Sequence, residues 1–226
     1  MDKYSILKQY YGHSAFRAGQ EALIDAILSG RDALCVMPTG GGKSLCYQIP
    51  ALLLPGITLV VSPLISLMKD QVAALKSAGV PAAYINSSLT GEQIRTVYAR
   101  TRKGAYKLIY VAPERLETNS FLSLMQEMDV SFLAVDEAHC ISQWGQDFRP
   151  SYLDIVDFIN ALPRRPIVAA YTATATKQVQ SDILRLLQLQ SPYRIVTGFD
   201  RPNLYFDVRR PKNKFSALAA LIDERR

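Results

Sequence analysis

Residues that bind metals or form disulfides are scarce in this 226-residue chain. It has three cysteines, Cys35, Cys46 and Cys140, which lie far apart and form no CxxC pair, and two histidines, His13 and His139. These spacings argue against a zinc site or a disulfide framework, and they are typical of a protein from a reducing compartment.

Long apolar runs, internal repeats and low-complexity segments are also lacking. No apolar stretch reaches the roughly 20 residues of a membrane-spanning helix. The first 14 residues, MDKYSILKQYYGHS, lack the apolar run of a secretory signal peptide. We therefore expect a soluble, intracellular protein without a membrane partner.

The composition favours a folded chain with a large core. Hydrophobic residues make up 49%, and 26 Lys and Arg against 20 Asp and Glu give a net charge of +6. This excess is compatible with a polyanionic partner such as nucleic acid, although many ordinary enzymes carry as much positive charge.

Short apolar runs alternate with helical patterns along the chain. Strands are predicted at residues 33–37, 57–61, 82–85, 108–111, 132–135, 167–171 and 193–196. Nearly uninterrupted apolar strands indicate a sheet that is covered on both faces, and strand–helix alternation indicates parallel pairing. The predicted fold class is α/β, a doubly wound and mostly parallel sheet with helices on both faces, whose ligand site lies at the carboxyl ends of the strands.

A glycine-rich segment joins the first strand to the next helix, and it reads MPTGGGKS at residues 37–44. Glycines let successive N–H groups point at phosphate oxygens, and the helix adds its positive N-terminus. The lysine can reach the β- and γ-phosphates, and the serine hydroxyl can bind Mg²⁺. The general P-loop pattern has glycine where this chain has methionine, and the alternative is a glycine-rich turn with a surface lysine. The residues expected to bind nucleotide here are Met37, Pro38, Thr39, Gly40, Gly41, Gly42, Lys43 and Ser44.

A second strand ends in two acidic residues within the run FLAVDEAH, residues 132–139. We expect Asp136 to hold Mg²⁺ and Glu137 to orient and deprotonate the attacking water. Two solvated acids at a strand end are the alternative interpretation. Together with the glycine-rich loop, the pair predicts nucleotide hydrolysis rather than nucleotide storage.

A P-loop followed by Asp-Glu-Ala-His resembles the second superfamily of helicases, and the rest of the chain resembles the RecQ family of DNA helicases over residues 16–203. That resemblance implies a RecA-like P-loop fold. The segment FRAGQ, residues 16–20, is similar to the family's motif 0, in which the glutamine reads the adenine edge. It implies nucleotide-binding roles for Phe16, Arg17 and Gln20, and a glutamine amide suits adenine because it both donates and accepts hydrogen bonds.

Further segments resemble the family's DNA-contacting and coupling motifs. Residues 61–71 (VSPLISLMKDQ) imply contacts from Ser62 and Pro63 to the single-strand backbone, and residues 111–115 (VAPER) resemble the next DNA-contacting segment. Residues 171–175 (YTATA) imply that Thr172 and Thr174 couple hydrolysis to movement. Helix caps and strand-end turns are the competing explanation for these polar residues.

The run CISQWGQDFRP, residues 140–150, resembles the aromatic-rich loop of RecQ proteins and contains the only tryptophan. Trp144 and Phe148 can stack on bases, Arg149 can pair with phosphate, and His139 would link this loop to the nucleotide site. A buried tryptophan that anchors the loop is the alternative. Two positions depart from the family pattern, namely Gln146 where histidine is common and Tyr171 where an aliphatic residue is usual.

The resemblance implies an ATP- and Mg²⁺-using lobe of a 3′→5′ DNA helicase that acts on single-stranded or partly duplex DNA in repair and recombination, in the bacterial cytoplasm at the nucleoid. We expect this lobe at residues 1–200. Residues 201–226 are expected to be a connector, a strand at 204–208 and a helix at about 214–225 of a second lobe that is otherwise missing. Without that lobe's arginine the chain is expected to bind ATP and DNA but to hydrolyse ATP poorly. Alternatives are a DEAH-type RNA helicase, a nucleotide- or DNA-binding module without unwinding activity, and a P-loop ATPase that is not a helicase.

Overall fold

The computed structural model describes residues 1–198, 204–205 and 207–224. The strands are β1 (Ala33–Val36), β2 (Ile57–Val61), β3 (Ala82–Ile85), β4 (Leu108–Val111), β5 (Val130–Val135), β6 (Ile167–Thr172) and β7 (Tyr193–Val196). The α-helices are α1 (Lys3–Tyr11), α2 (Gln20–Leu28), α3 (Lys43–Leu53), α4 (Ile65–Ser77), α5 (Gly91–Arg102), α6 (Asn119–Glu127), α7 (Ile155–Ala161), α8 (Lys177–Leu186) and α9 (Lys214–Asp223). Short 3₁₀ turns are η1 (Pro113–Arg115), η2 (Ala138–Ile141) and η3 (Pro150–Tyr152).

The seven strands form one sheet in the order β3-β4-β2-β5-β6-β1-β7. Each strand pair found among the described residues is parallel. Every residue of β1, β2 and β4 is buried, because helices cover both faces of the sheet. The predicted fold class is confirmed.

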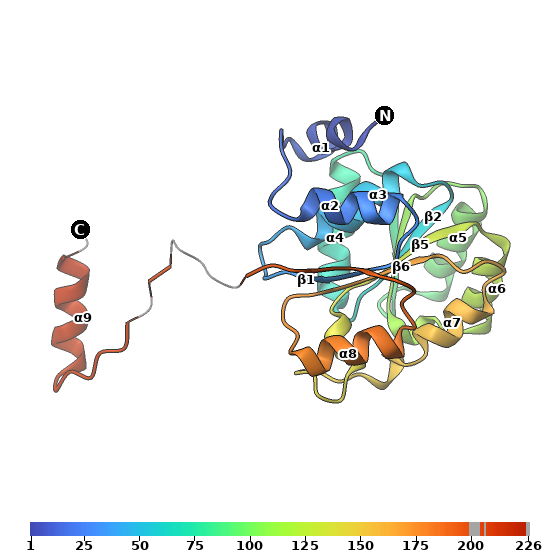
Figure 1. Ribbon diagram of the computed structural model, residues 1–226. Helices are drawn as coiled ribbons and strands as arrows, with labels where there is room; N and C mark the ends of the chain where they lie inside the picture. The colour runs from blue at the N-terminus through green and yellow to red at the C-terminus, as the bar shows by residue number, and fades with distance from the viewer. Residues whose placement is uncertain (199–203, 206, 225–226) are drawn as a thin grey trace.

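Alternate residues of the central strands belong to two separate hydrophobic cores, one on each face of the sheet. Leu34 and Val36 of β1 join the core under α5, α6, α7 and α8, whereas Ala33 and Cys35 join the core under α2, α3 and α4. Figure 1 shows α2 and α3 on one side of the sheet and α7 and α8 on the other. Helix α1 packs outside α2 and α3 through a smaller cluster that includes Ile6 and Ile49.

Strand order brings the predicted motifs to one edge of the sheet. The P-loop segment follows β1, the acidic pair follows β5, and the segment YTATA begins within β6, which lies between these two strands. The register pairs Val36 with Thr172 and Val135 with Ala170. Since parallel strands end on the same edge, three segments separated by up to about 130 residues of chain meet there.

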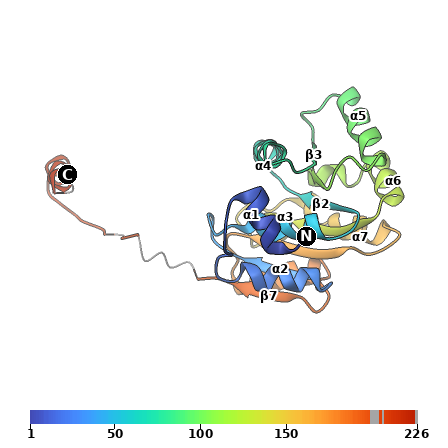
Figure 2. The same ribbon diagram turned by 90° about the horizontal axis from the view of Figure 1, so that it is seen from above.

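The strand predicted at 204–208, after β7, is not found among the described residues. The described residues 204, 205, 207 and 208 are not in a strand, since none of them pairs with another segment. The expected helix is present as α9, but it buries none of its residues and lies apart from the rest in both views (Figures 1 and 2). Most of the expected connector, residues 199–203, lies outside the described residues, and the domain division at residue 200 stays a prediction.

In the part of the chain that the structure describes, no helix is both long enough and apolar enough to span a membrane.

Candidate functional site

A cavity of about 440 Å³ opens at the carboxyl edge of the sheet between the P-loop, the end of β5 and the segment before α2. The predicted site residues that line it are Arg17, Gln20, Thr39, Gly40, Gly42, Lys43, Ser44, Asp136 and Glu137. Phe16, Met37, Pro38 and Gly41 do not line it. Phe16 instead packs its ring against Tyr4, with 5.4 Å between ring centroids. The phosphate-loop residues and the acidic pair, which are distant in sequence, therefore share one cavity.

The P-loop is held in a tight turn that ends at Gly42, the N-cap of α3. Gly42 has a φ of 84°, and a Cβ there would lie 2.3 Å from Nε2 of Gln20, so a side chain at this position would strain the backbone and displace the Gln20 amide. The Nζ of Lys43 donates to the Met37 carbonyl at 3.0 Å. An ammonium group has three N–H donors, so this contact leaves Lys43 further donors for a phosphate oxygen.

Gln20 supports the P-loop through both ends of its amide. Its Oε1 accepts from the Arg17 N–H at 2.8 Å, and its Nε2 donates to the carbonyls of Gly42 at 3.1 Å and Gly41 at 3.3 Å. The side chain is 1% exposed, and the Arg17 guanidinium donates to the Gly40 carbonyl. Adenine recognition by Gln20 stays a prediction, and it requires the amide to exchange some of these partners.

Asp136 lies at the end of β5, where its N–H donates to the Val61 carbonyl at 2.8 Å. The Tyr152 hydroxyl donates to the Asp136 carbonyl at 2.8 Å, and the Asp136 carboxylate accepts from the Glu137 N–H at 3.0 Å. Burial, followed by the neighbouring Glu137 charge, raises the pKa of Asp136 to about 6. This carboxylate is fixed in place but costs free energy when it is ionised.

Ser44 and Asp136 line the same cavity as Lys43. Hydroxyl and carboxylate oxygens are ligands that Mg²⁺ accepts, and this ion commonly takes its remaining ligands from phosphates and water. Within the described residues there is no cluster of three or more His, Cys, Asp or Glu side chains that could hold a metal. The residues fit an Mg²⁺ ion that arrives with a nucleotide.

Glu137 occupies the left-handed region, with a φ of 47°. For a residue with a side chain this conformation costs about 1–2 kcal/mol, and it turns the chain from β5 into η2. A hydrogen bond from His139 is the main cause that lowers the pKa of Glu137. The half-buried carboxylate is thus ionised at neutral pH, the state that a general base requires.

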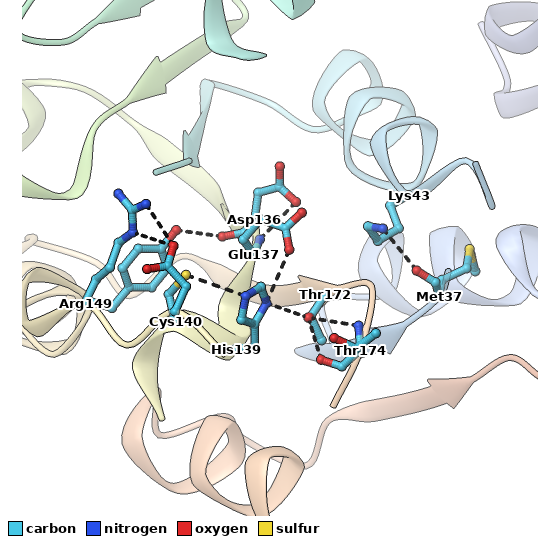
Figure 3. A network of polar contacts seen from close by, with 11 residues as sticks. Met37, Lys43, Asp136, Glu137, His139, Cys140, Arg149, Thr172 and Thr174 are labelled. Carbon is cyan, nitrogen blue, oxygen red and sulfur yellow. Dashed lines mark hydrogen bonds and ion pairs between the residues drawn. The ribbon is translucent and has the colours of Figure 1, made fainter. Parts of the chain in front are cut away.

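His139 joins the acidic pair to the end of β6, as Figure 3 shows. Its Nδ1 lies 3.3 Å from the Glu137 carboxylate and 2.9 Å from the Thr172 hydroxyl. That hydroxyl donates its own proton to the Thr174 carbonyl at 3.0 Å, so Nδ1 carries hydrogen and donates to it. Contacts with Cys140 and then Glu137 raise the pKa of His139.

The aromatic segment, residues 140–150, presents Trp144 with 75% of its surface exposed. The alternative of a buried anchor is therefore not what the structure has. The backbone N–H of Trp144 donates to Ser142 Oγ at 3.2 Å, and the Ser142 hydroxyl donates to the Asp182 carboxylate of α8 at 2.7 Å. A cavity of about 90 Å³ is lined by Trp144, His139 and Thr174 together with neighbouring residues, so the aromatic segment shares a cavity with both His139 and Thr174.

Other predicted DNA contacts are placed differently. Ser62 is 1% exposed and its N–H donates to the Val111 carbonyl at 3.1 Å, because it continues the buried strand β2. The carbonyl of Pro63 accepts from the Arg149 guanidinium at 3.2 Å, and Phe148 is half-buried. DNA contact by these residues stays a prediction that the buried position of Ser62 does not favour.

Some residues that line the cavity were not predicted from the sequence. Gln71 and Leu67 line the cavity from α4, and Gln71 is fixed by the Gln48 amide, which donates to it at 2.9 Å. Their i, i+4 spacing inside the segment at 61–71 indicates a shared helix face. His13 and Ala15 also line the cavity, and nothing in their neighbouring sequence indicates it.

Asp136→Asn is expected to raise the melting temperature of the nucleotide-free chain at pH 7.5 by about 5 °C, because it removes a buried charge. The rise of the pKa from 3.8 to about 6 corresponds to about 3 kcal/mol of unfavourable ionisation. The pKa of Asp136 is higher in the folded chain than in the unfolded chain. The free energy of unfolding that neutral Asp136 contributes is therefore fully present below pH 3.8 and is lost as the pH rises through 6. Thermal melts at pH 7.5 and pH 5 should show that the melting temperature of the Asp136→Asn variant exceeds that of the wild type by less at the lower pH. An equal or lower melting temperature at pH 7.5 would contradict this account.

Comparison with known proteins shows the family of this chain. A family model described as DEAD/DEAH box helicase matches residues 17–182. The sheet also resembles that of the Pyrococcus furiosus Hef helicase domain, with a TM-score of 0.62 and 21% identity over 80% of this chain and 38% of that one. Fold and site define a P-loop lobe of the helicase type, and the chain belongs to the DEAD/DEAH box helicase family.

Within that class the similarity extends to RecQ helicases, as the motifs indicate. The chain is 50% identical to the ATP-dependent DNA helicase RecQ of Bacillus subtilis over 93% of its own length and 36% of that protein. It is 49% identical to RecQ of Haemophilus influenzae, over 96% of this chain and 35% of that protein. The resemblance to RecQ is confirmed, and the chain spans about a third of the length of these relatives.

Proposed function

We propose that the chain is the ATP-binding motor lobe of a RecQ-like 3′→5′ DNA helicase. The observation that carries the proposal is that Lys43, Ser44, Asp136 and Glu137 line one cavity. A P-loop lysine and a strand-end acidic pair together suit phosphoryl transfer to water. The printed names of the RecQ relatives, ATP-dependent DNA helicases, support ATP and DNA as the ligands.

The P-loop and the acidic pair have separate roles in the proposed reaction. The N–H groups of the P-loop and the N-terminus of α3 bind the phosphates, and Lys43 neutralises charge on the β- and γ-phosphates. Ser44 and Asp136 hold Mg²⁺, which supplies further charge neutralisation when it is bound. Glu137 orients water and accepts its proton, and the pKa-lowering contact with His139 keeps it ready to do so.

A path for DNA coupling starts at the same residues. His139 contacts both Glu137 and Thr172, and the aromatic segment lies against His139 and Thr174. A base stacked on exposed Trp144 would press on this segment, and a shift there reaches the general base through His139. DNA binding is therefore proposed to alter the position of Glu137.

The alternatives differ in what they predict. A DEAH-type RNA helicase is not favoured, because the relatives are named as DNA helicases. A binding module without turnover is compatible with this chain alone, since we propose that the arginine which stabilises the transition state belongs to a second lobe. Such an arginine raises the rate about 10³–10⁵-fold in related phosphoryl-transfer sites.

The test is ATP binding and steady-state hydrolysis by the 226-residue chain and by a protein that continues into a second lobe, each with single-stranded DNA, with RNA and without nucleic acid. We expect ATP binding by both, near-background turnover by the short chain, and turnover of the longer protein that DNA stimulates more than RNA. Trp144→Ala should lower the DNA stimulation about ten-fold, since stacking contributes about 1–3 kcal/mol per base, and leave basal hydrolysis within two-fold. Equal loss of both rates, or stimulation by RNA alone, would contradict the proposal.

A further inference from the structure

Helix α3, which carries Lys43 and Ser44 in its first turn, contains a proline. Pro50 lies inside the helix and is buried. Because proline has no N–H, it cannot donate to the carbonyl four residues earlier, and its ring pushes against that carbonyl. The carbonyl concerned belongs to Cys46, one turn from the phosphate-binding residues.

The Cys46 carbonyl lies in a dry environment, where a missing hydrogen bond is costly. Cys46 is fully buried, with 0% of its surface exposed. An unpaired carbonyl in such a place loses its hydration without compensation. A donor from outside the helix is therefore needed.

Tyr171 of β6 supplies that donor. Its hydroxyl donates to the Cys46 carbonyl at 3.2 Å, and its ring packs edge-on against Tyr47 of α3 with 5.3 Å between centroids. Tyr171 is fully buried, and this burial raises its pKa well above the ordinary value. The hydroxyl thus keeps its proton and stays a donor throughout the physiological pH range.

This bond joins two parts of the site that are distant in sequence. Tyr171 directly precedes Thr172, whose hydroxyl contacts His139 (Figure 3). Cys46 lies within one turn of Lys43 and Ser44. The hydroxyl of Tyr171 therefore connects the strand of the coupling residues to the helix of the phosphate-binding residues.

We propose that Tyr171 is a positioning residue for the phosphate site, which replaces the helical hydrogen bond that Pro50 removes and thereby holds the first turn of α3 against β6. The inference rests on the proposed function only for its nucleotide-binding part. Phenylalanine at position 171 would preserve the packing against Tyr47, so the hydroxyl alone accounts for the effect.

The test is a double-mutant cycle with Tyr171→Phe and Pro50→Ala. In the chain that keeps Pro50, Tyr171→Phe should lower the melting temperature by about 3–6 °C, since it leaves the buried Cys46 carbonyl without a hydrogen-bond donor. Alanine at position 50 has an N–H for the Cys46 carbonyl, so in the Pro50→Ala chain the same change should cost less than half as much. Tyr98→Phe is the matched control, because the Tyr98 hydroxyl is buried without a hydrogen-bond partner, and its removal should not lower the melting temperature.

Nucleotide affinity shows whether the Tyr171 hydroxyl positions the phosphate site or only stabilises the fold. Titration of a fluorescent ATP analogue with Mg²⁺ should show binding about three- to ten-fold weaker in Tyr171→Phe, a loss of roughly 0.7–1.4 kcal/mol, and near wild-type affinity in the double variant. Unchanged affinity in Tyr171→Phe, or equal losses of melting temperature in both backgrounds, would overturn the inference. A wild-type chain that binds no nucleotide would overturn the proposed function as well, whereas the thermal cycle would still decide whether the hydroxyl replaces the missing bond.

Discussion

Glu137→Gln is expected to reduce DNA-stimulated ATP hydrolysis by about 10²–10⁴-fold, the range that a positioned general base contributes. Glutamine has nearly the same shape as glutamate but cannot accept a proton from water. The left-handed backbone at position 137 and the contact with His139 define where this group lies. Glutamine can retain a contact with His139, so the turn from β5 into η2 should persist.

ATP binding is the second readout for Glu137→Gln. The phosphates are expected to bind to the P-loop and Lys43, so affinity should stay within about three-fold of the wild type. Glu127→Gln is a suitable control, because Glu127 pairs with Arg102 on the surface and does not line the cavity. Loss of binding together with turnover would mean that Glu137 is needed for the structure of the site. Turnover within ten-fold of the wild type would show that another group accepts the proton.

Lys43→Ala is expected to weaken binding of ATP by about 100-fold or more and to abolish hydrolysis, because its charge faces the β- and γ-phosphates in the proposed complex. Charge-assisted hydrogen bonds are about twice as strong as neutral ones, and their loss inside a cavity is poorly replaced by water. In the nucleotide-free structure the ammonium group donates to the Met37 carbonyl, so the substitution removes one loop contact too.

Separating these two effects needs a measurement without nucleotide. The melting temperature of nucleotide-free Lys43→Ala should be lower than that of the wild type by no more than about 2–4 °C, which corresponds to the loss of one ordinary hydrogen bond. Lys103→Ala, at the exposed C-cap of α5, is the control for a general loss of positive charge. Undiminished hydrolysis by Lys43→Ala would contradict the assignment of residues 37–44 as the phosphate site.

Much of this protein could be predicted from local sequence patterns. Strands 57–61, 82–85, 108–111 and 193–196 begin and end as predicted. Apolar runs such as 57–61 and 108–111 form strands because the sheet buries both of their faces, whereas the edge strand 193–196 alternates half-buried and exposed residues. Helix α5 begins with a capping box of Thr90 and Gln93, a pattern that can be recognised in a sequence because its two hydrogen bonds involve only residues three apart. The phosphate loop and the acidic pair were likewise visible, because each depends on residue types at fixed short spacings.

The sequence predicted which residues belong to the candidate site better than it predicted how their side chains are placed. Gln20 lines the cavity as expected, but the sequence did not show that its amide also supports the P-loop, and adenine recognition by Gln20 stays a prediction. Ser62 was expected at a DNA-contacting surface, but it is buried at the end of β2. Both positions depend on how the segment packs against distant parts of the chain, and a short motif contains no information about that packing.

The sequence by itself determined the α/β class, the residue types of the phosphate site and the polar residues at the strand ends. Only the tertiary structure decided that β6 lies between β1 and β5, so that Thr172 contacts His139, and that Tyr171 meets the carbonyl left unpaired by Pro50. Strand order and buried hydrogen-bond partners arise when both faces of the sheet are covered and every buried polar group finds a partner. These conditions hold for the whole chain at once, and no single segment can specify them.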